Sequence, residues 1–252
     1  PPPVHRLQVP DEEAASRIQI IKDEEDVPVT IPRMTMPQSA SRRLRVDLHS
    51  PDPESIERAV DVILDGGIVA IPTDTVYGLA ADASRPEAVR KLYEIKKRPS
   101  LKPVPLLIHN RELIRSVASM LPKEIDVLMA KYWPGALTMI VRKFAGSFDT
   151  AAPGDTIGVR MPKHSVALAI LAMIGRPLAV SSANISGGDA ARDADDIEAM
   201  FGESVDLIVD CGPSGASAES TVLDVSAMPY HIVREGAVPR QELVEVLGEN
   251  LV

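Results

Sequence analysis

Residues 66–79 read GGIVAIPTDTVYGL, and the interpretation of the whole chain starts from this stretch. The two glycines suit a turn because they tolerate positive φ, and the apolar run Ile68–Ile71 is typical of a buried strand. Pro72 ends that strand because it has no N–H to donate. The polar residues 73–77 therefore follow a buried strand, where α/β sheets usually bind ligands. The alternative is a strand-to-helix loop in which threonine and aspartate act only as caps.

The composition allows one large domain or two small ones, since 45% of the 252 residues are hydrophobic. Aromatic residues make up only 3%, so the core must be built from Val, Ile, Leu, Ala and Met. The formal net charge is −9, which argues against broad, non-specific binding of nucleic acid. A local basic cleft is still compatible with this charge.

Residues 1–46 differ in composition from the rest of the chain. They open with three prolines, alternate acidic clusters with proline, and end in the basic run Arg42–Arg45. Without a sustained amphipathic period, this segment is predicted to be a disordered or loosely packed extension, and residues 47–252 to form the folded domain. Its basic end could contact RNA or could simply be a solvated run of charge.

The single cysteine, Cys211, excludes an intrachain disulfide and fits a reducing compartment, so we expect a cytoplasmic protein. Its thiol is either a nucleophile or, as is commoner beside a strand-like run, a structural residue. No apolar run is long enough to span a bilayer, and the first residues lack a signal pattern. We therefore expect no membrane partner.

Helical spacing and buried apolar runs alternate along the chain. The start signal Ser50–Glu54 opens a helix that Gly66 ends. Further helices are predicted at 86–96, 111–117, 122–132, 164–174, 193–201 and 239–247. Further strands are predicted at 104–108, 136–141, 156–162, 177–180, 205–210, 220–225 and 231–234.

Three segments carry candidate binding groups. Residues 96–103 (KKRPSLKP) place four cations within seven residues on a loop stiffened by two prolines, which suits a phosphate clamp. Capping of the preceding helix would explain one or two of these cations but not Lys102. Arg160 lies in an apolar strand and needs an anionic partner, either a protein carboxylate or a substrate. Residues 181–188 (SSANISGG) repeat the order of strand, small polar residues and glycine, which lets a backbone approach an oxyanion.

Seven segments in order resemble the YrdC-like domain family, the L-threonylcarbamoyladenylate synthases, over about residues 53–240. They are PTDTVYGL at 72–79, KKRP at 96–99, WPGALT at 133–138, VRMP at 159–162, SANISG at 182–187, ESTVLD at 219–224 and REG at 234–236. The resemblance implies a single α/β domain in which helices flank a twisted mixed sheet around a concave basic cleft.

The resemblance also implies an activity. Members of the family condense L-threonine, bicarbonate and ATP to threonylcarbamoyl-AMP and release pyrophosphate, with Mg²⁺ expected on the triphosphate. The product serves threonylcarbamoyl modification of the tRNA adenosine next to the anticodon. The implied partners are a downstream tRNA threonylcarbamoyl transferase complex and tRNA or double-stranded RNA.

Site residues are carried over from the matching motifs. The catalytic group implied is Lys96, Arg98, Ser182 and Asn184. The threonine site implied is Thr73, Arg160 and Ser220. The nucleotide site implied is Lys96, Arg98, Ser100, Thr156, Ser182, Asn184, Arg192 and Arg234. No general base is evident among them.

The chain departs from the family pattern at two places. A family histidine falls at Leu107, with His109 out of register, and the usual S-P-T after the SAN motif is replaced by residues 190–192 (AAR). Two alternatives therefore stay open. One is a module for double-stranded RNA, tRNA or ribosome maturation, and the other is a paralogue that acts on another carbamoyl or nucleotide substrate.

Overall fold

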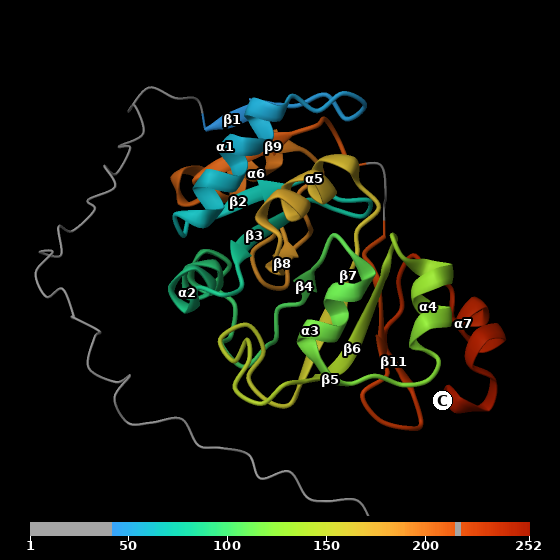
Figure 1. Ribbon diagram of the computed structural model, residues 1–252. Coiled ribbons are helices and arrows are strands. Elements are labelled where there is room, and N and C mark those ends of the chain that lie inside the picture. Colours follow the sequence, from blue (N-terminus) through green and yellow to red (C-terminus); the bar gives the residue numbers. More distant parts are fainter. Residues whose placement is uncertain (1–41, 215–217) are drawn as a thin grey trace, which may run out of the picture. The chain divides into compact units, whose positions relative to one another are not determined.

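A computed structural model describes residues 42–214 and 218–252 (Figure 1). The predicted extension lies mostly outside these residues, but its end does not. Residues 43–45 form a strand, β1, that pairs in parallel with β9. The folded domain thus starts several residues before the predicted boundary, because the alternating Arg-Leu-Arg run completes a sheet edge.

The strands of the described residues form one mixed sheet with the order β1-β9-β2-β3-β8-β4-β7-β6-β10-β11, and β5 pairs with β6. The sheet contains parallel pairs, such as β2 with β9 and β6 with β10, and antiparallel pairs, such as β3 with β8 and β6 with β7. The strands are β1 (Arg43–Arg45), β2 (Val69–Ile71), β3 (Gly78–Asp82), β4 (Leu106–Leu107), β5 (Ala118–Met120), β6 (Leu137–Lys143), β7 (Thr156–Arg160), β8 (Leu178–Ser182), β9 (Leu207–Asp210), β10 (Thr221–Asp224) and β11 (His231–Arg234).

Helices flank this sheet, as the sequence predicted (Figure 1). They are α1 (Pro53–Leu64), α2 (Pro86–Ile95), α3 (Ile114–Val117), α4 (Ile125–Tyr132), α5 (Ser165–Ile174), α6 (Ala194–Phe201) and α7 (Arg240–Leu247). Local signals set several of their ends. Asp52 accepts from the Ser55 amide at 3.0 Å and caps α1, and Gly175, at φ 71°, ends α5.

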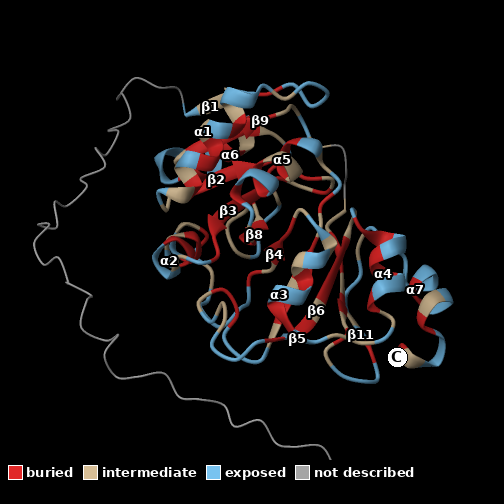
Figure 2. Ribbon diagram, viewed as in Figure 1, coloured by how far each residue is buried: buried red, intermediate tan, exposed pale blue. Residues whose placement is uncertain are grey.

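Two apolar clusters cover the two faces of the sheet (Figure 2). Strand alternation at the central strand separates them, since Ile68 and Ala70 belong to one cluster and Val69 and Ile71 to the other. Helices α1 and α5 complete the second cluster, and α2, α4, α6 and α7 pack into the first. The central strand is therefore buried on both sides, as its continuous apolar run predicted.

The main difference from the sequence prediction lies after β2. We expected a polar loop leading to a helix, but the chain turns back and forms β3, which is buried throughout and pairs antiparallel with β2. Its sequence, GLAAD, has no β-branched residue and so gave little strand signal. Gly78 is required there because a Cβ would lie 2.6 Å from Val180 Cγ1 of β8. Strand β4 is shorter than predicted, since Pro103 and Pro105 have no N–H for a ladder.

In the described part of the chain, none of the helices combines the length and the apolarity that a bilayer span requires.

Cys211 follows β9 and is half-buried. Its amide donates to the Tyr77 hydroxyl at 3.2 Å, and burial raises the pKa of its thiol to about 12. The side chain packs against the cluster that α1 and α5 complete. These features favour the structural role over the nucleophilic one.

We predict that Cys211 resists alkylation in the folded protein. With a thiol pKa near 12, the thiolate fraction at pH 8 is about a thousandfold lower than for an unperturbed cysteine. The thiolate of a weaker acid is more nucleophilic, but this offsets only part of the loss in reaction rate. Modification by iodoacetamide should therefore be slower by about thirtyfold or more than in the urea-unfolded chain, measured by mass spectrometry. Equal rates in both states would contradict the burial of this thiol.

Candidate active site

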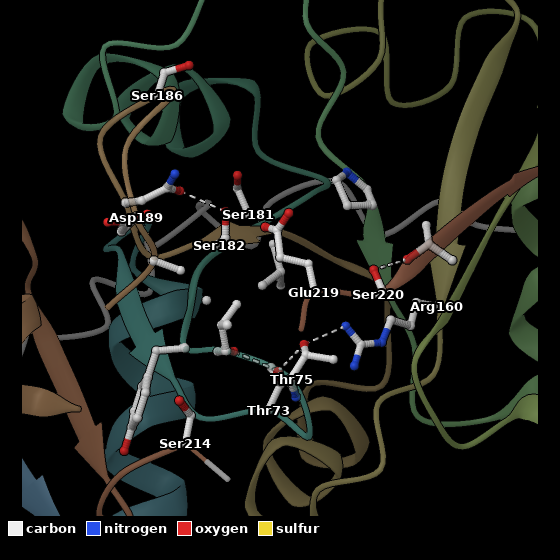
Figure 3. A pocket seen from close by; sticks show the side chains of 18 of the residues that line it. Thr73, Thr75, Arg160, Ser181, Ser182, Ser186, Asp189, Ser214, Glu219 and Ser220 are labelled. Atoms are coloured by element: carbon white, nitrogen blue, oxygen red, sulfur yellow. Dashed lines mark hydrogen bonds between the residues drawn. The ribbon is translucent and has the colours of Figure 1, made fainter. Parts of the chain in front are cut away.

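A cavity of about 950 Å³ lies where the β2–β3 connection, the loop after α2 and the loop after β8 meet the start of β10 (Figure 3). This volume is near the upper end of the usual range for ligand sites. The polar and charged residues that line it are Thr73, Thr75, Tyr77, Arg98, Lys102, Thr138, Arg160, Ser181, Ser182, Asn184, Ser186, Asp189, Arg192, Ser214, Glu219, Ser220 and Arg234.

The β2–β3 connection forms a tight, internally bonded turn. The Thr73 hydroxyl donates to the Val76 carbonyl at 2.7 Å, accepts from the Thr75 amide at 3.1 Å and lies 3.0 Å from the Thr75 hydroxyl. Thr73 and Thr75 are both buried at the wall of the cavity. The predicted turn chemistry and the predicted position at a cavity are therefore both present in this loop.

Arg160 is held from three sides and is only 6% exposed. It donates from Nε to the Gly135 carbonyl at 2.9 Å, from Nη1 to Thr75 Oγ1 at 3.0 Å and from Nη2 to Asp74 Oδ1 at 2.6 Å. The Lys163 amide also donates to Asp74 Oδ1 at 2.9 Å. The anionic partner that Arg160 requires is thus a protein carboxylate. Of five guanidinium N–H groups, two have no acceptor among the described residues and remain for a ligand.

Lys96 lies behind the loop that follows β8 and is 1% exposed. Its ammonium donates to the Ser182 carbonyl, to the Asn184 carbonyl at 2.6 Å and to Asn184 Oδ1 at 3.0 Å. Burial lowers the pKa of Lys96 to about 8, while three oxygen acceptors favour its charged form, so the side chain is protonated at neutral pH. In this structure Lys96 holds the loop in place and does not line the cavity.

The loop after β8 is ordered by its own polar groups as well. Ser182 Oγ donates to Asn184 Oδ1 at 2.7 Å, and Asn184 Nδ2 donates to the Gly188 carbonyl at 2.6 Å. The Ser186 amide donates to the Lys96 carbonyl at 3.0 Å. The side chains of Ser182 and Asn184 are therefore preorganised at the cavity wall.

The loop after α2 brings Arg98 to the cavity. Lys97 adopts φ 49°, an unusual value for a residue other than glycine, and this turns the chain between the buried Lys96 and Arg98. Arg98 donates from Nε to the Lys102 carbonyl at 3.0 Å and from Nη2 to the Pro103 carbonyl at 2.7 Å. These bonds fold the loop and leave the remaining N–H groups of Arg98 available to a ligand.

The start of β10 supplies the opposite wall. Ser220 Oγ lies 2.9 Å from Thr138 Oγ1 and accepts from Arg234 Nη2 at 3.1 Å, while Arg234 Nη1 donates to Glu219 Oε2 at 2.6 Å. Gly236 packs directly on this segment, since a Cβ would lie 2.6 Å from the Ser220 carbonyl carbon. That close approach explains the glycine of the REG motif.

Most of the residues predicted from sequence line the cavity. They are Thr73, Arg98, Arg160, Ser182, Asn184, Arg192, Ser220 and Arg234. Three others do not. Lys96 lies behind the loop, Ser100 is exposed on the turn after α2, and Thr156 begins β7, about 13 Å along the strand from Arg160. Their assigned roles stay predictions.

The sequence analysis missed several lining residues, among them Thr138, Asp189 and Glu219. Glu219 had an available signal, because it is adjacent to Ser220 in the ESTVLD segment. Leu107 also lines the cavity, whereas His109 does not, and the His109 Nδ1 atom is buried without a partner among the described residues. The departure at Leu107 therefore changes the cavity wall itself.

The lining carries five cationic and two acidic side chains. Two of the cations are ion-paired, Arg160 with Asp74 and Arg234 with Glu219. Within the described ranges, no ion pair is found for the other three, Arg98, Lys102 and Arg192. This arrangement can bind an anionic ligand.

Three basic residues outside the cavity, two of them in the basic run predicted at the end of the extension, are engaged in ion pairs. Arg42 pairs with Glu203 at 2.7 Å, and Arg43 pairs with Asp210 at 2.9 Å. Lys91 pairs with Asp206 at 2.6 Å. The basic end of the predicted extension thus serves the docking of β1 and adjacent segments.

Comparison with known proteins supports the resemblance seen in the sequence. The model of the Sua5, YciO and YrdC family, described as "Telomere recombination", matches residues 61–236. The chain belongs to this family. A putative threonylcarbamoyl-AMP synthase of Mycobacterium leprae is 38% identical over 80% of this chain and 93% of its own length. The threonylcarbamoyl-AMP synthase of Pyrococcus abyssi is 36% identical over 77% of this chain.

Solved structures of the family share this fold. P. abyssi Sua5 complexed with L-threonine superposes with a TM-score of 0.80 at 34% identity, covering 83% of this chain and 62% of that chain. Escherichia coli YciO superposes with a TM-score of 0.74 at 24% identity and shows the fold alone. The chain spans 57% of the P. abyssi relative and 59% of the Bacillus subtilis synthase, which is 35% identical.

We predict that Lys96→Met destabilises the protein and lowers any ligand binding at the loop. Removing the ammonium leaves the Asn184 carbonyl without a donor among the described residues, at a cost of about 1–3 kcal/mol, and takes one of two donors from the Ser182 carbonyl and from Asn184 Oδ1. The free energy of unfolding, measured by urea denaturation, should fall by about that amount or more.

The matched control is Lys97→Met. It removes the same charge from the neighbouring residue, whose side chain is exposed. Its free energy of unfolding should lie within about 0.5 kcal/mol of the value for the unmodified protein. If the two variants unfold alike, Lys96 does not support the loop.

Proposed function

We propose that this chain is a threonylcarbamoyl-AMP synthase, which condenses L-threonine, bicarbonate and ATP to threonylcarbamoyl-AMP and pyrophosphate. The observation that carries the proposal is a cavity lined by the fixed, buried Arg160 and by three further cations. These three have no acidic partner among the described residues. Such a cavity suits an amino-acid carboxylate together with a triphosphate. Curated relatives with that name, at 35–38% identity, support the same activity.

The size of the cavity supports two ligands bound together. A volume of about 950 Å³ exceeds what a small amino acid needs and leaves space for a nucleotide beside it. In the proposed arrangement, Arg160 binds the threonine carboxylate through its two remaining N–H groups, and Thr73 and Ser220 lie nearby. Arg98, Arg192 and Arg234, with Ser182 and Asn184, face the nucleotide and the reacting carboxyl region.

The reaction suits such a site because it needs positioning and charge stabilisation more than covalent help from the protein. The threonine nitrogen bonds to the carbon of bicarbonate, water leaves, and a carbamate forms. A carbamate oxygen then bonds to the α-phosphorus of ATP as the bond to pyrophosphate breaks. Negative charge develops on the phosphates in the second step, where Arg98 and Lys102 of the loop after α2 can stabilise it.

Mg²⁺ is proposed to enter with ATP. The described residues contain no group of three His, Cys, Asp or Glu side chains that could hold a metal ion. They therefore do not form an all-protein metal cage, and they are compatible with Mg²⁺ carried on the triphosphate. The ion would neutralise phosphate charge that the protein cations leave uncompensated.

We further propose that the product passes, in the cytoplasm, to a tRNA threonylcarbamoyl transferase complex. Threonylcarbamoyl-AMP is a mixed anhydride, so it requires an acceptor such as the adenosine next to the anticodon. A binding site for double-stranded RNA on the chain itself gains no support from Arg42, Arg43 and Lys91, because each already pairs with an acidic residue.

We predict that purified protein releases pyrophosphate from ATP, with bicarbonate and Mg²⁺, only when L-threonine is present. A coupled phosphate assay measures the release, and mass spectrometry identifies threonylcarbamoyl-AMP. Release with a different carbamoyl acceptor but not with threonine would favour the paralogue that uses another substrate. No release with any acceptor would overturn the proposed enzyme.

We predict that Arg98→Ala lowers threonine-dependent pyrophosphate release by about a hundredfold, since the transition state loses a cation at the phosphates. Its KM for ATP should rise while its melting temperature changes little, because the carbonyls that accept from the Arg98 guanidinium belong to its own loop. Lys97→Met is again the control and should keep full activity. Unchanged kinetics in Arg98→Ala would exclude this residue from the phosphate site.

A further inference from the structure

A carboxylate stands in a cavity that is otherwise suited to anions. Glu219 immediately precedes Ser220, and its side chain is 41% exposed. Among the described residues that line the cavity, Glu219 and Asp189 are the two acidic ones. The charge of Glu219 acts on Arg98 of the cavity and on Lys96 behind it, since it opposes the effect of burial on the pKa values of both. Arg234 compensates part of this charge, and the part that it leaves repels triphosphate and attracts a positive group of a ligand.

Glu219 is held rigidly at one oxygen and is open at the other. Its Oε2 accepts from Arg234 Nη1 at 2.6 Å, and Arg234 is itself fixed by the Ser220 carbonyl at 2.8 Å. The Ala237 amide donates to the Glu219 carbonyl at 3.0 Å, and Gly236 packs against the same backbone. Glu219 Oε1 has no donor among the described residues. The protein therefore presents a preoriented acceptor to the cavity.

The strand register relates this acceptor to Arg160. Strands β7, β6 and β10 are neighbours, and the β6–β7 register, continued by one pair, sets Thr138 opposite Arg160. Thr138 Oγ1 in turn lies 2.9 Å from Ser220 Oγ. The β6–β10 register sets Ser220 level with Ala136, two residues from Thr138, so the backbones of Arg160 and Ser220 are about 12 Å apart across two strand spacings. Two long side chains can span that gap. Figure 3 shows Glu219 between Ser182 and Ser220, on the side of Arg160, while Asp189 lies on the other side of Ser182.

An α-amino acid carries its carboxylate and its ammonium on the same carbon atom. A ligand whose carboxylate meets Arg160 must therefore place its ammonium only a few ångströms away, where an anionic acceptor is required. We propose that Glu219 Oε1 accepts a hydrogen bond from the α-ammonium group of the amino-acid substrate and so selects amino acids over hydroxy acids. The inference rests on the proposed function, because it takes L-threonine as that substrate.

The test measures binding by isothermal titration calorimetry with two probes. One is L-threonine, and the other is (2S,3R)-2,3-dihydroxybutanoate, which replaces the ammonium by a hydroxyl and keeps every other group. The unmodified protein should bind threonine more tightly by about tenfold or more, since only threonine pairs with the carboxylate. Glu219→Gln should lose about tenfold in threonine affinity and bind the dihydroxy acid as before.

Asp189→Asn is the matched control, because it removes the other carboxylate of the lining. Its threonine affinity should equal that of the unmodified protein. Thermal melting of each variant checks that the fold is retained, and titrations in EDTA remove any contribution of Mg²⁺. An effect of Glu219→Gln that appears only with Mg·ATP would identify Glu219 as a metal ligand and overturn the inference.

Two further outcomes separate the inference from the proposed function. If the unmodified protein binds threonine and Glu219→Gln binds it equally, or loses both probes alike, the ammonium contact is wrong and the proposed function stands. If the unmodified protein binds no threonine, both fail together.

Discussion

The buried ammonium of Lys96 is the interaction on which the cavity depends. Three oxygen atoms of Ser182 and Asn184 converge on it, and the Asn184 carbonyl has no other donor among the described residues. The same residue ends α2, so one charge joins a helix on one face of the sheet to the loop that carries Ser182 and Asn184. Its neighbour Lys97 takes up a strained backbone angle, and this directs Arg98 to the cavity.

The fold could be predicted from sequence where the physical signals are strong. The apolar run of β2, the helix start at Asp52 and the glycines that end helices all have local causes, and each lies where it was predicted. Strand β3 was missed because its small residues carry no strand propensity. It exists because Gly78 lets it approach Val180, and a contact between distant segments cannot be inferred from local sequence.

The candidate site follows the same division. Residue type and motif order predicted that Thr73, Arg160 and Ser182 would belong to one site, and the structure brings them to one cavity. They did not predict that Asp74 would be the partner of Arg160, or that Lys96 would point away from the cavity. Pairing between side chains depends on three-dimensional packing, which a motif does not encode. Glu219 was overlooked because the role of an acidic residue in an anion site cannot be inferred until its spatial neighbours are known.

The ion pair between Asp74 and Arg160 gives the two ends of the cavity different responses to ionic strength. Arg160 is buried beside its carboxylate, so mobile ions hardly reach its field and a ligand bound there is held mainly by hydrogen bonds. Arg98, Lys102 and Arg192 have no acidic partner among the described residues, and their attraction acts through solvent, where the Debye length is about 8 Å at physiological salt. Added salt should therefore weaken capture of a polyanion while leaving recognition of a small zwitterion nearly constant.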